Sequence, residues 1–175
     1  GNRAHALARL GELARHAPAD ERGGDALQRV QWLREWRRPF AAVAASDTAL
    51  HWTRGTPTWN RVRLERARAF RDAGKPDSAL ALYARVARSA AEPVLRMIAW
   101  WEYAREAQDD SRWALAARGF RLADSLGMTL RDEAALVQGA STLAGLMDWM
   151  QGRRVEAIRA WRATVDRKAR FWLGV

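Results

Sequence analysis

The sequence contains no cysteine, only two lysines and no apolar run long enough to cross a membrane. The lack of cysteine excludes disulfide bonds, thiolate catalysis and cysteine-ligated metal sites, but it leaves cytoplasm and periplasm open as compartments. The longest uncharged run, Ala134 to Met147, is too short for a span of about 20 residues. We therefore expect no transmembrane helix, and the localisation stays undecided.

Signatures of catalysis and metal binding are also missing. The three histidines, His5, His16 and His51, have no second metal-type ligand at a recognised spacing. No nucleophile elbow, zinc-protease motif or phosphate-binding glycine motif occurs. We expect no enzymatic activity, no metal and no cofactor.

Basic residues outnumber acidic ones by 30 to 20, which gives a formal net charge of +10. This excess favours anionic partners on electrostatic grounds. Because 28 of the basic residues are arginine and alanine is abundant, G/C-rich coding explains the excess equally well. The charge is uneven, at +7 over residues 1–75, −2 over 76–150 and +5 over 151–175. The basic end is either a solvated face or a surface for nucleic acid, acidic lipid or an acidic protein.

The apolar residues follow a helical period, and no long stretch alternates between apolar and polar residues. Proline, glycine and capping residues predict about nine helices joined by short turns, which makes neighbouring helices antiparallel. After an N-terminal helix and loop at residues 1–24, the next helix is expected to open at Gly23-Gly24-Asp25. Residues 25–175 are predicted to form about four helical hairpins within a single domain covering 1–175.

A spaced pattern of small and aromatic residues repeats along the chain. Three copies are clear: Ala79-x3-Tyr83-x2-Val86, Ala116-x3-Phe120-x2-Ala123 and Ala157-x3-Trp161-x2-Thr164. A weaker copy reads Ala45-x3-Ala49-x2-Trp52, so that the leading alanines are 34, 37 and 41 residues apart. Small residues allow two helices to approach closely, and the aromatic residues fill the space against the next hairpin.

At these residues the sequence resembles the tetratricopeptide repeat family, whose pattern is W-x2-L-G-x2-Y…A-x3-F…P. The resemblance covers roughly residues 27–170, with Trp100 at the tryptophan position of the third copy and Gly145 at the glycine position of the fourth. It implies an all-α fold, a right-handed α-solenoid of antiparallel helix hairpins whose first helices line a concave groove.

Two groups of residues are candidates for partner binding. In the repeat frame, Arg34, Arg68 and Arg105 precede the leading alanines by eleven residues and are expected to face the groove. Such a ladder suits carboxylates or backbone carbonyls, although Glu65 and Glu102 can instead pair with Arg68 and Arg105 within each helix. The second group is aromatic and comprises Trp101, Trp113 and Trp172, because tryptophan is favoured at interfaces.

The sequence therefore predicts a non-enzymatic scaffold or adaptor that holds a protein partner, such as an acidic segment or a multi-subunit complex. Because the chain begins with Gly1 and ends on an apolar Phe171–Val175 stretch, we expect a subunit or segment of a larger assembly. Two alternatives stay open, a sensor segment of a longer regulatory protein and a binder of nucleic acid or anionic membrane surfaces. Nucleic acid is disfavoured because no groove-reading motif or base-stacking platform is identifiable.

Overall fold

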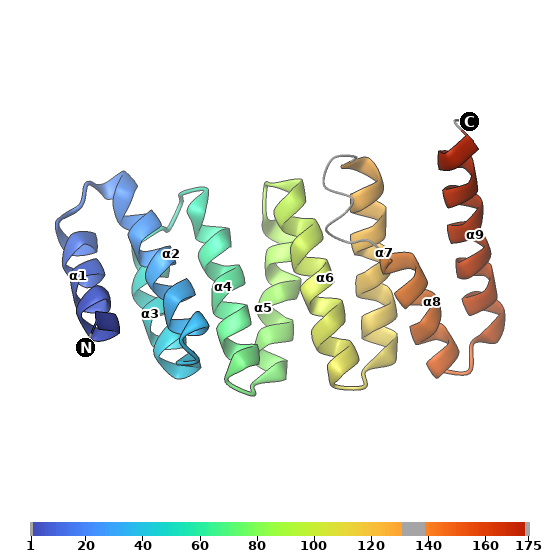
Figure 1. Ribbon diagram of the computed structural model, residues 1–175, viewed down its shortest axis with the longest axis horizontal. Helices are drawn as coiled ribbons and strands as arrows, with labels where there is room; N and C mark the ends of the chain where they lie inside the picture. Colours follow the sequence, from blue (N-terminus) through green and yellow to red (C-terminus); the bar gives the residue numbers. More distant parts are fainter. Residues whose placement is uncertain (1, 131–138, 174–175) are drawn as a thin grey trace. The chain divides into compact units, whose positions relative to one another are not determined.

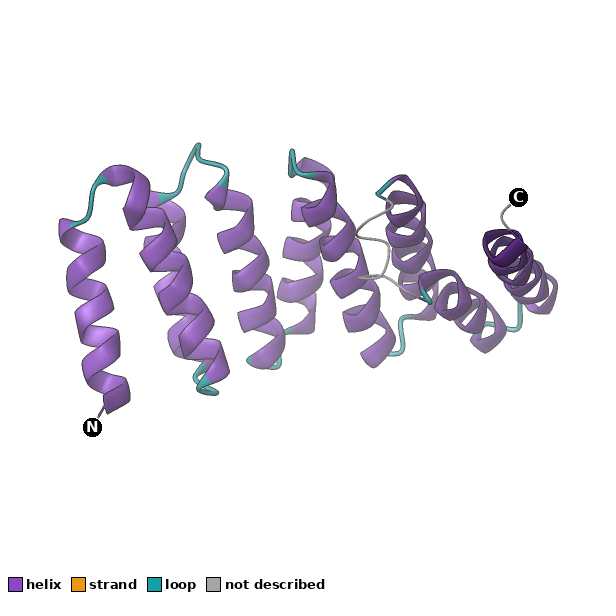
Figure 2. Cartoon of the chain, turned by 45° about the horizontal axis from the view of Figure 1, so that its top comes forward, coloured by secondary structure: helices purple, strands orange, loops and turns teal. Residues whose placement is uncertain are grey.

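The computed structural model describes the backbone of residues 2–130 and 139–173, with the side chains of residues 3, 14, 15, 19, 20 and 167–173 outside the description. These residues form nine α-helices and, as Figure 2 shows for the same ranges, no strand. The helices are α1 (Asn2–His16), α2 (Ala19–Glu35), α3 (Pro39–Trp52), α4 (Thr58–Asp72), α5 (Pro76–Ser89), α6 (Pro93–Asp109), α7 (Trp113–Thr129), α8 (Ala140–Met150) and α9 (Arg154–Leu173) (Figure 1). The predicted all-α class is confirmed.

The chain divides into two compact units, Gly1–Val86 and Ala87–Val175, and the division falls within α5. In the first unit α2 packs against α1, α3 and α4, and α3 also packs against α4. In the second unit α7 packs against α6 and α8, and α8 packs against α9. Over the described ranges, no helix combines the length and the hydropathy that a membrane span requires.

Four of the helices end in the same turn. The residue after each C-cap has a positive φ, namely Arg37 (54°), Gly74 (69°), Ser111 (56°) and Gly152 (75°). The N–H of this residue donates to the carbonyl three residues earlier, and the next N–H donates to the carbonyl five residues before it. These two hydrogen bonds form the Schellman motif, which satisfies carbonyl groups at a helix end. The turns close α2, α4, α6 and α8 at intervals of 37, 37 and 41 residues.

The turns correct the register of the predicted repeat. The three clear copies each begin five residues after a turn residue, but the same count from Arg37 places the first copy at Ala42 rather than Ala45. Ala42, Ser46 and Ala49 are fully buried, whereas Ala45 is only half-buried. The predicted first copy was therefore wrong by three residues, because an arginine stands where the later turns have glycine or serine.

The predicted start of the second helix was also wrong. α2 begins at Ala19 and continues through Gly23 and Gly24, so the expected loop before Asp25 is part of a helix. Gly23 has a packing reason to lie inside the helix, since a Cβ there would come 2.9 Å from Thr53 Cγ2. Glycine often ends a helix, so the sequence also predicts a boundary at Gly127, but Gly127 lies inside α7. The helix expected to follow it falls partly on residues 131–138, outside the described residues.

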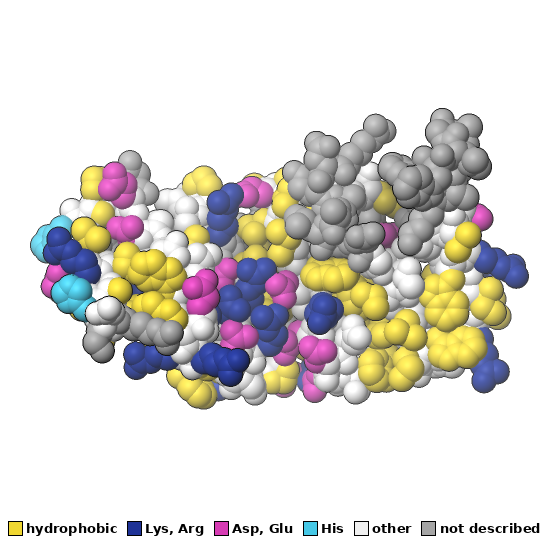
Figure 3. Space-filling model, in the orientation of Figure 1, with side chains coloured by type: hydrophobic (Ala, Val, Ile, Leu, Met, Phe, Trp, Pro, Cys, Tyr) yellow, Lys and Arg dark blue, Asp and Glu magenta, His cyan; other side chains and the backbone are white. Residues whose placement is uncertain are grey.

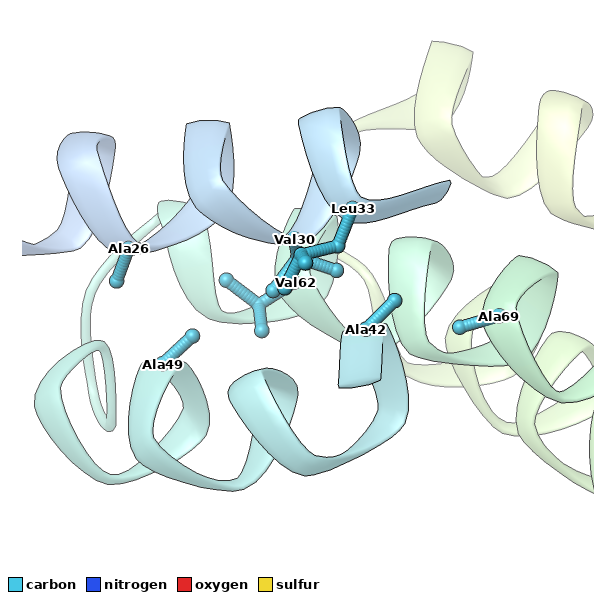
Figure 4. Packing of buried hydrophobic residues seen from close by; sticks show 7 residues of the cluster. All are labelled: Ala26, Val30, Leu33, Ala42, Ala49, Val62 and Ala69. Carbon is cyan, nitrogen blue, oxygen red and sulfur yellow. The ribbon is translucent and has the colours of Figure 1, made fainter. Parts of the chain in front are cut away.

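One buried cluster of the first unit is built mainly from small side chains of three helices. Figure 4 shows Val30 of α2 and Val62 of α4 meeting above the alanines of α3. The cluster consists of Ala26, Val30, Leu33, Ala42, Ala49, Val62 and Ala69. Because these side chains are small, α2, α3 and α4 pack closely.

An aromatic contact lies in the core of the second unit. Phe120 of α7 is fully buried, and its ring meets Trp101 of α6 edge-on at 5.3 Å between centroids. α6 and α7 approach closely at Gly119, where a Cβ would come 2.9 Å from Ala104 Cβ. This ring contact is with the preceding helix, whereas the spacing predicts packing of Phe120 against the next hairpin.

Candidate functional site

Two of the predicted arginines hold one buried carboxylate. Arg34 Nη1 donates to Glu65 Oε2 at 2.6 Å, and Arg68 Nη1 donates to Glu65 Oε1 at 2.9 Å. Arg34 Nε also donates to Asp72 Oδ2 at 2.9 Å. In Figure 3, basic and acidic side chains lie interleaved over α4, in line with these pairs. The within-helix pairing of Arg68 that the sequence left open is thus present. Arg34 joins α2 to α4 through Glu65 and Asp72.

Arg105 differs from the other two arginines. It is exposed on α6 in the second unit and has no ion pair with any residue in the described part of the chain. The corrected register also changes which residues occupy the predicted groove position of each repeat. In the first repeat, the residue eleven before Ala42 is Gln31, not Arg34. Arg68 and Arg105 therefore occupy the same repeat position, eleven residues before a leading alanine, and Arg34 does not.

The predicted aromatic anchors have different surroundings. Trp101 is half-buried against Phe120, so much of its ring is used within the second unit. Trp113 is half-buried at the first residue of α7. Trp172 belongs to α9, but its side chain lies outside the described ones.

A basic pocket in the first unit, which we call the Arg63 pocket, was not predicted. It has a volume of about 550 Å³ and is lined by side chains from α3, the following loop, α4 and α5. Its polar lining consists of His51, Arg54, Arg63, Arg66, Ser78 and Arg85. Its apolar lining consists of Leu50, Trp59, Phe70 and Leu82.

Helical spacing explains why these residues meet. Arg63, Arg66 and Phe70 are three and four residues apart, which places them on one face of α4. Glu65 is two residues from Arg63, so it leaves α4 on nearly the opposite side, toward Arg34. The Arg63 pocket and the Glu65 ion pairs therefore use different faces of the same helix.

Arg63 is the most deeply placed cation of the pocket. It is only 5% exposed, its guanidinium lies 4.6 Å from the Trp59 ring centre, and Nη1 donates to Asn60 Oδ1 at 3.0 Å. Burial, together with the positive charge of Arg85, lowers the pKa of Arg63 below the usual arginine value. The protein thus holds a cation where both the low water content and a neighbouring like charge disfavour it.

The second pocket arginine on α4 has a charged partner. Arg66 forms an ion pair with Asp47 of α3, and its guanidinium lies 5.4 Å from the Phe70 ring centre. Stacking on a ring leaves the edge of a guanidinium free to present its N–H fork. The pocket therefore combines several hydrogen-bond donors with apolar walls, which is the chemistry of an oxyanion site next to an apolar contact.

The sequence carried one signal for this pocket. α4 contains arginine at 61, 63, 66, 68 and 71, and these positions cover more than one helix face. The repeat pattern instead predicts a binding surface on the face of α4 that contains Arg68. The contribution of α3 and α5 depends on tertiary packing, so no local pattern indicates it.

The second unit exposes hydrophobic side chains over α8 and the beginning of α9, which appear as a yellow area in Figure 3. Trp149 is 44% exposed, packs its ring 6.0 Å from that of Trp161 and lies under the Arg154 guanidinium. Met150 and Val155 are also exposed beside it. Trp149 is not among the partner-binding residues predicted from the sequence.

The residues that the structure describes contain no group of three or more histidine and acidic side chains able to hold a metal ion. No protein-family model matches the chain, and no curated protein matches it in sequence.

Proposed function

We propose that the protein is a non-enzymatic binding module that acts as a scaffold or adaptor for a protein partner. The observation that carries this proposal is the Arg63 pocket, in which four arginines and one histidine line a surface cavity together with apolar side chains. Concave sites with a few convergent polar groups and apolar walls are typical of ligand recognition.

The architecture that we propose for this module is a right-handed α-solenoid of tetratricopeptide-like helix hairpins. Two regularities support it. The same Schellman turn closes every second helix from α2 to α8, and small buried residues follow five positions later at Ala42, Ala79, Ala116 and Ala157. Stacked helix pairs of this kind present extended surfaces to partners.

The experiment that tests the function is affinity capture of the full chain from its own cells in mild detergent, followed by mass spectrometry. We expect a protein that co-purifies at fixed stoichiometry. Recovery of the chain alone would contradict the proposal. Recovery only with nucleic acid that salt removes, or only with anionic lipid, would replace it with the corresponding surface-binding function.

A further inference from the structure

The arginines of the Arg63 pocket are not required by the repeat itself. The two turns at Gly74 and Ser111 set a shift of 37 residues between the α4–α5 and α6–α7 segments. At that shift, Arg63, Arg66 and Arg85 correspond to Trp100, Tyr103 and Leu122. Trp100 is buried, and its ring meets that of Tyr103 edge-on at 5.5 Å. One part of the chain therefore fills these positions with hydrophobic packing, whereas the other part places cations there.

Placing cations at these positions has an energetic cost. A buried charge is unfavourable unless it is paired or hydrogen-bonded. Arg63 meets part of this condition through its hydrogen bond to Asn60 and its contact with the Trp59 ring. The positive charge of Arg85 adds repulsion at the same place. An anion bound between the two guanidinium groups would offset the repulsion between them.

The apolar walls restrict the kind of anion. Leu50, Leu82 and Phe70 line the pocket together with the arginines, so an inorganic anion would leave part of the lining without contacts. A volume of about 550 Å³ accommodates more than one side chain. The complementary ligand carries negative charge and an adjacent apolar group, as an acidic peptide segment does.

We propose that the Arg63 pocket binds an acidic peptide segment of the partner, with an oxyanion between Arg63 and Arg85 and a neighbouring apolar side chain against Leu50, Leu82 and Phe70. This inference rests on the proposed function as a protein-binding module. Carboxylate and phosphoryl groups both supply the oxyanion chemistry, since a guanidinium fork binds either one.

Fluorescence anisotropy with the full chain tests the proposal. The probes are a labelled peptide with glutamates flanking a leucine, its glutamine counterpart, its alanine-for-leucine counterpart and a phosphoserine version. We expect the glutamate or the phosphoserine peptide to bind at least about ten-fold more tightly than the glutamine peptide. The preferred one of the two identifies the oxyanion, and replacement of the leucine should weaken binding about three-fold or more.

Matched variants separate the pocket from general charge. Arg63→Gln with Arg85→Gln should weaken peptide binding about ten-fold, whereas Arg105→Gln with Arg118→Gln, which removes two exposed arginines of the second unit, should change it less than about two-fold. If the double variant does not fold, the single variant Arg85→Gln takes its place in the binding test, because Arg85 is at an exposed position.

Two results would overturn the inference. One is equal weakening by both double variants, which would indicate non-specific attraction. The other is tighter, pocket-dependent binding of a single-stranded oligonucleotide or of phosphatidylserine vesicles. If a stoichiometric partner is still captured by the Arg63→Gln, Arg85→Gln protein, the binding function stands and only the assignment of its site fails.

Discussion

Gly145 of α8 lies directly against the indole ring of Trp161 in α9. A Cβ on Gly145 would come 2.5 Å from Trp161 Nε1 and 2.8 Å from Cδ1, which is closer than non-bonded atoms approach. The same indole nitrogen donates to the Thr142 carbonyl at 3.1 Å, so the ring is fixed on α8 by a hydrogen bond as well as by contact. The glycine therefore sets how closely these two helices pack.

Gly145→Ala should destabilise the protein. The added methyl group forces the Trp161 ring to move, and overpacking of this kind lowers the free energy of unfolding by about 1–3 kcal/mol. Gly24→Ala is the matched control, because Gly24 lies inside α2 with nothing within 4 Å of the added Cβ. The control should raise the free energy of unfolding by up to about 1 kcal/mol. Urea denaturation measures both, and equal effects of the two substitutions would disprove the close packing at Trp161.

Arg34→Gln should also destabilise the protein, because it removes hydrogen bonds to Glu65 and Asp72 and leaves the Glu65 carboxylate, only 7% exposed, with fewer partners. We expect a loss of about 2 kcal/mol in the free energy of unfolding. Arg105→Gln, at the exposed position on α6, should change it by less than about 0.5 kcal/mol. If Arg34→Gln leaves stability intact and weakens partner binding instead, the ladder interpretation of the sequence is preferred.

Ser111→Gly tests the recurring turn. Ser111 has φ 56°, a conformation that costs side-chain-bearing residues more than it costs glycine. Glycine relieves this strain but loses more backbone entropy on folding. The two effects together should raise the free energy of unfolding by about 0.5 kcal/mol. Ser125→Gly, the same substitution inside α7, should lower it by about 0.5 kcal/mol. A loss of stability at Ser111 in thermal unfolding would contradict the turn geometry.

Asp47→Asn should strengthen anion binding. The Asp47 carboxylate pairs with Arg66 of the Arg63 pocket, so its neutralisation leaves that guanidinium available to a ligand. We expect about three-fold tighter binding of the acidic peptide, measured by anisotropy at constant ionic strength. Asp109→Asn, an exposed change of the same type on α6, should leave the affinity unchanged. Weaker binding by Asp47→Asn would show that Asp47 orients Arg66 for the ligand rather than competing with it.

The helices were largely predictable because their ends are marked by local chemistry. Proline opens α3, α5 and α6, and glycine closes α4 and α8, as the sequence suggests. The start of the first repeat could not be placed correctly, because its turn residue is Arg37. Arginine does not favour the positive φ that Arg37 adopts, so the sequence does not mark a turn there. The glycine pair predicts a helix start at Gly23, but Gly23 lies inside α2 and provides close contact with Thr53, which is distant in sequence.

The site was less predictable than the helices. Arginines are visible in the sequence, but their roles depend on which face of α4 each one occupies and on what packs there. Arg68 meets a buried carboxylate on one face, whereas Arg63 meets a ring and the charge of Arg85 on the other. The surroundings of each face of α4, with Arg34 of α2 on one and the pocket residues of α3 and α5 on the other, distinguish a structural arginine from a candidate binding residue.

The most direct test of the binding function is site-specific photocrosslinking in the protein's own cells. A photoreactive amino acid at Ser78, in the wall of the Arg63 pocket, is compared with the same residue at Ser125 on α7 of the second unit. We predict a single protein adduct from position 78 that an excess of acidic peptide abolishes, and no such adduct from position 125. No adduct at position 78, or the same adducts from both positions, would contradict the account.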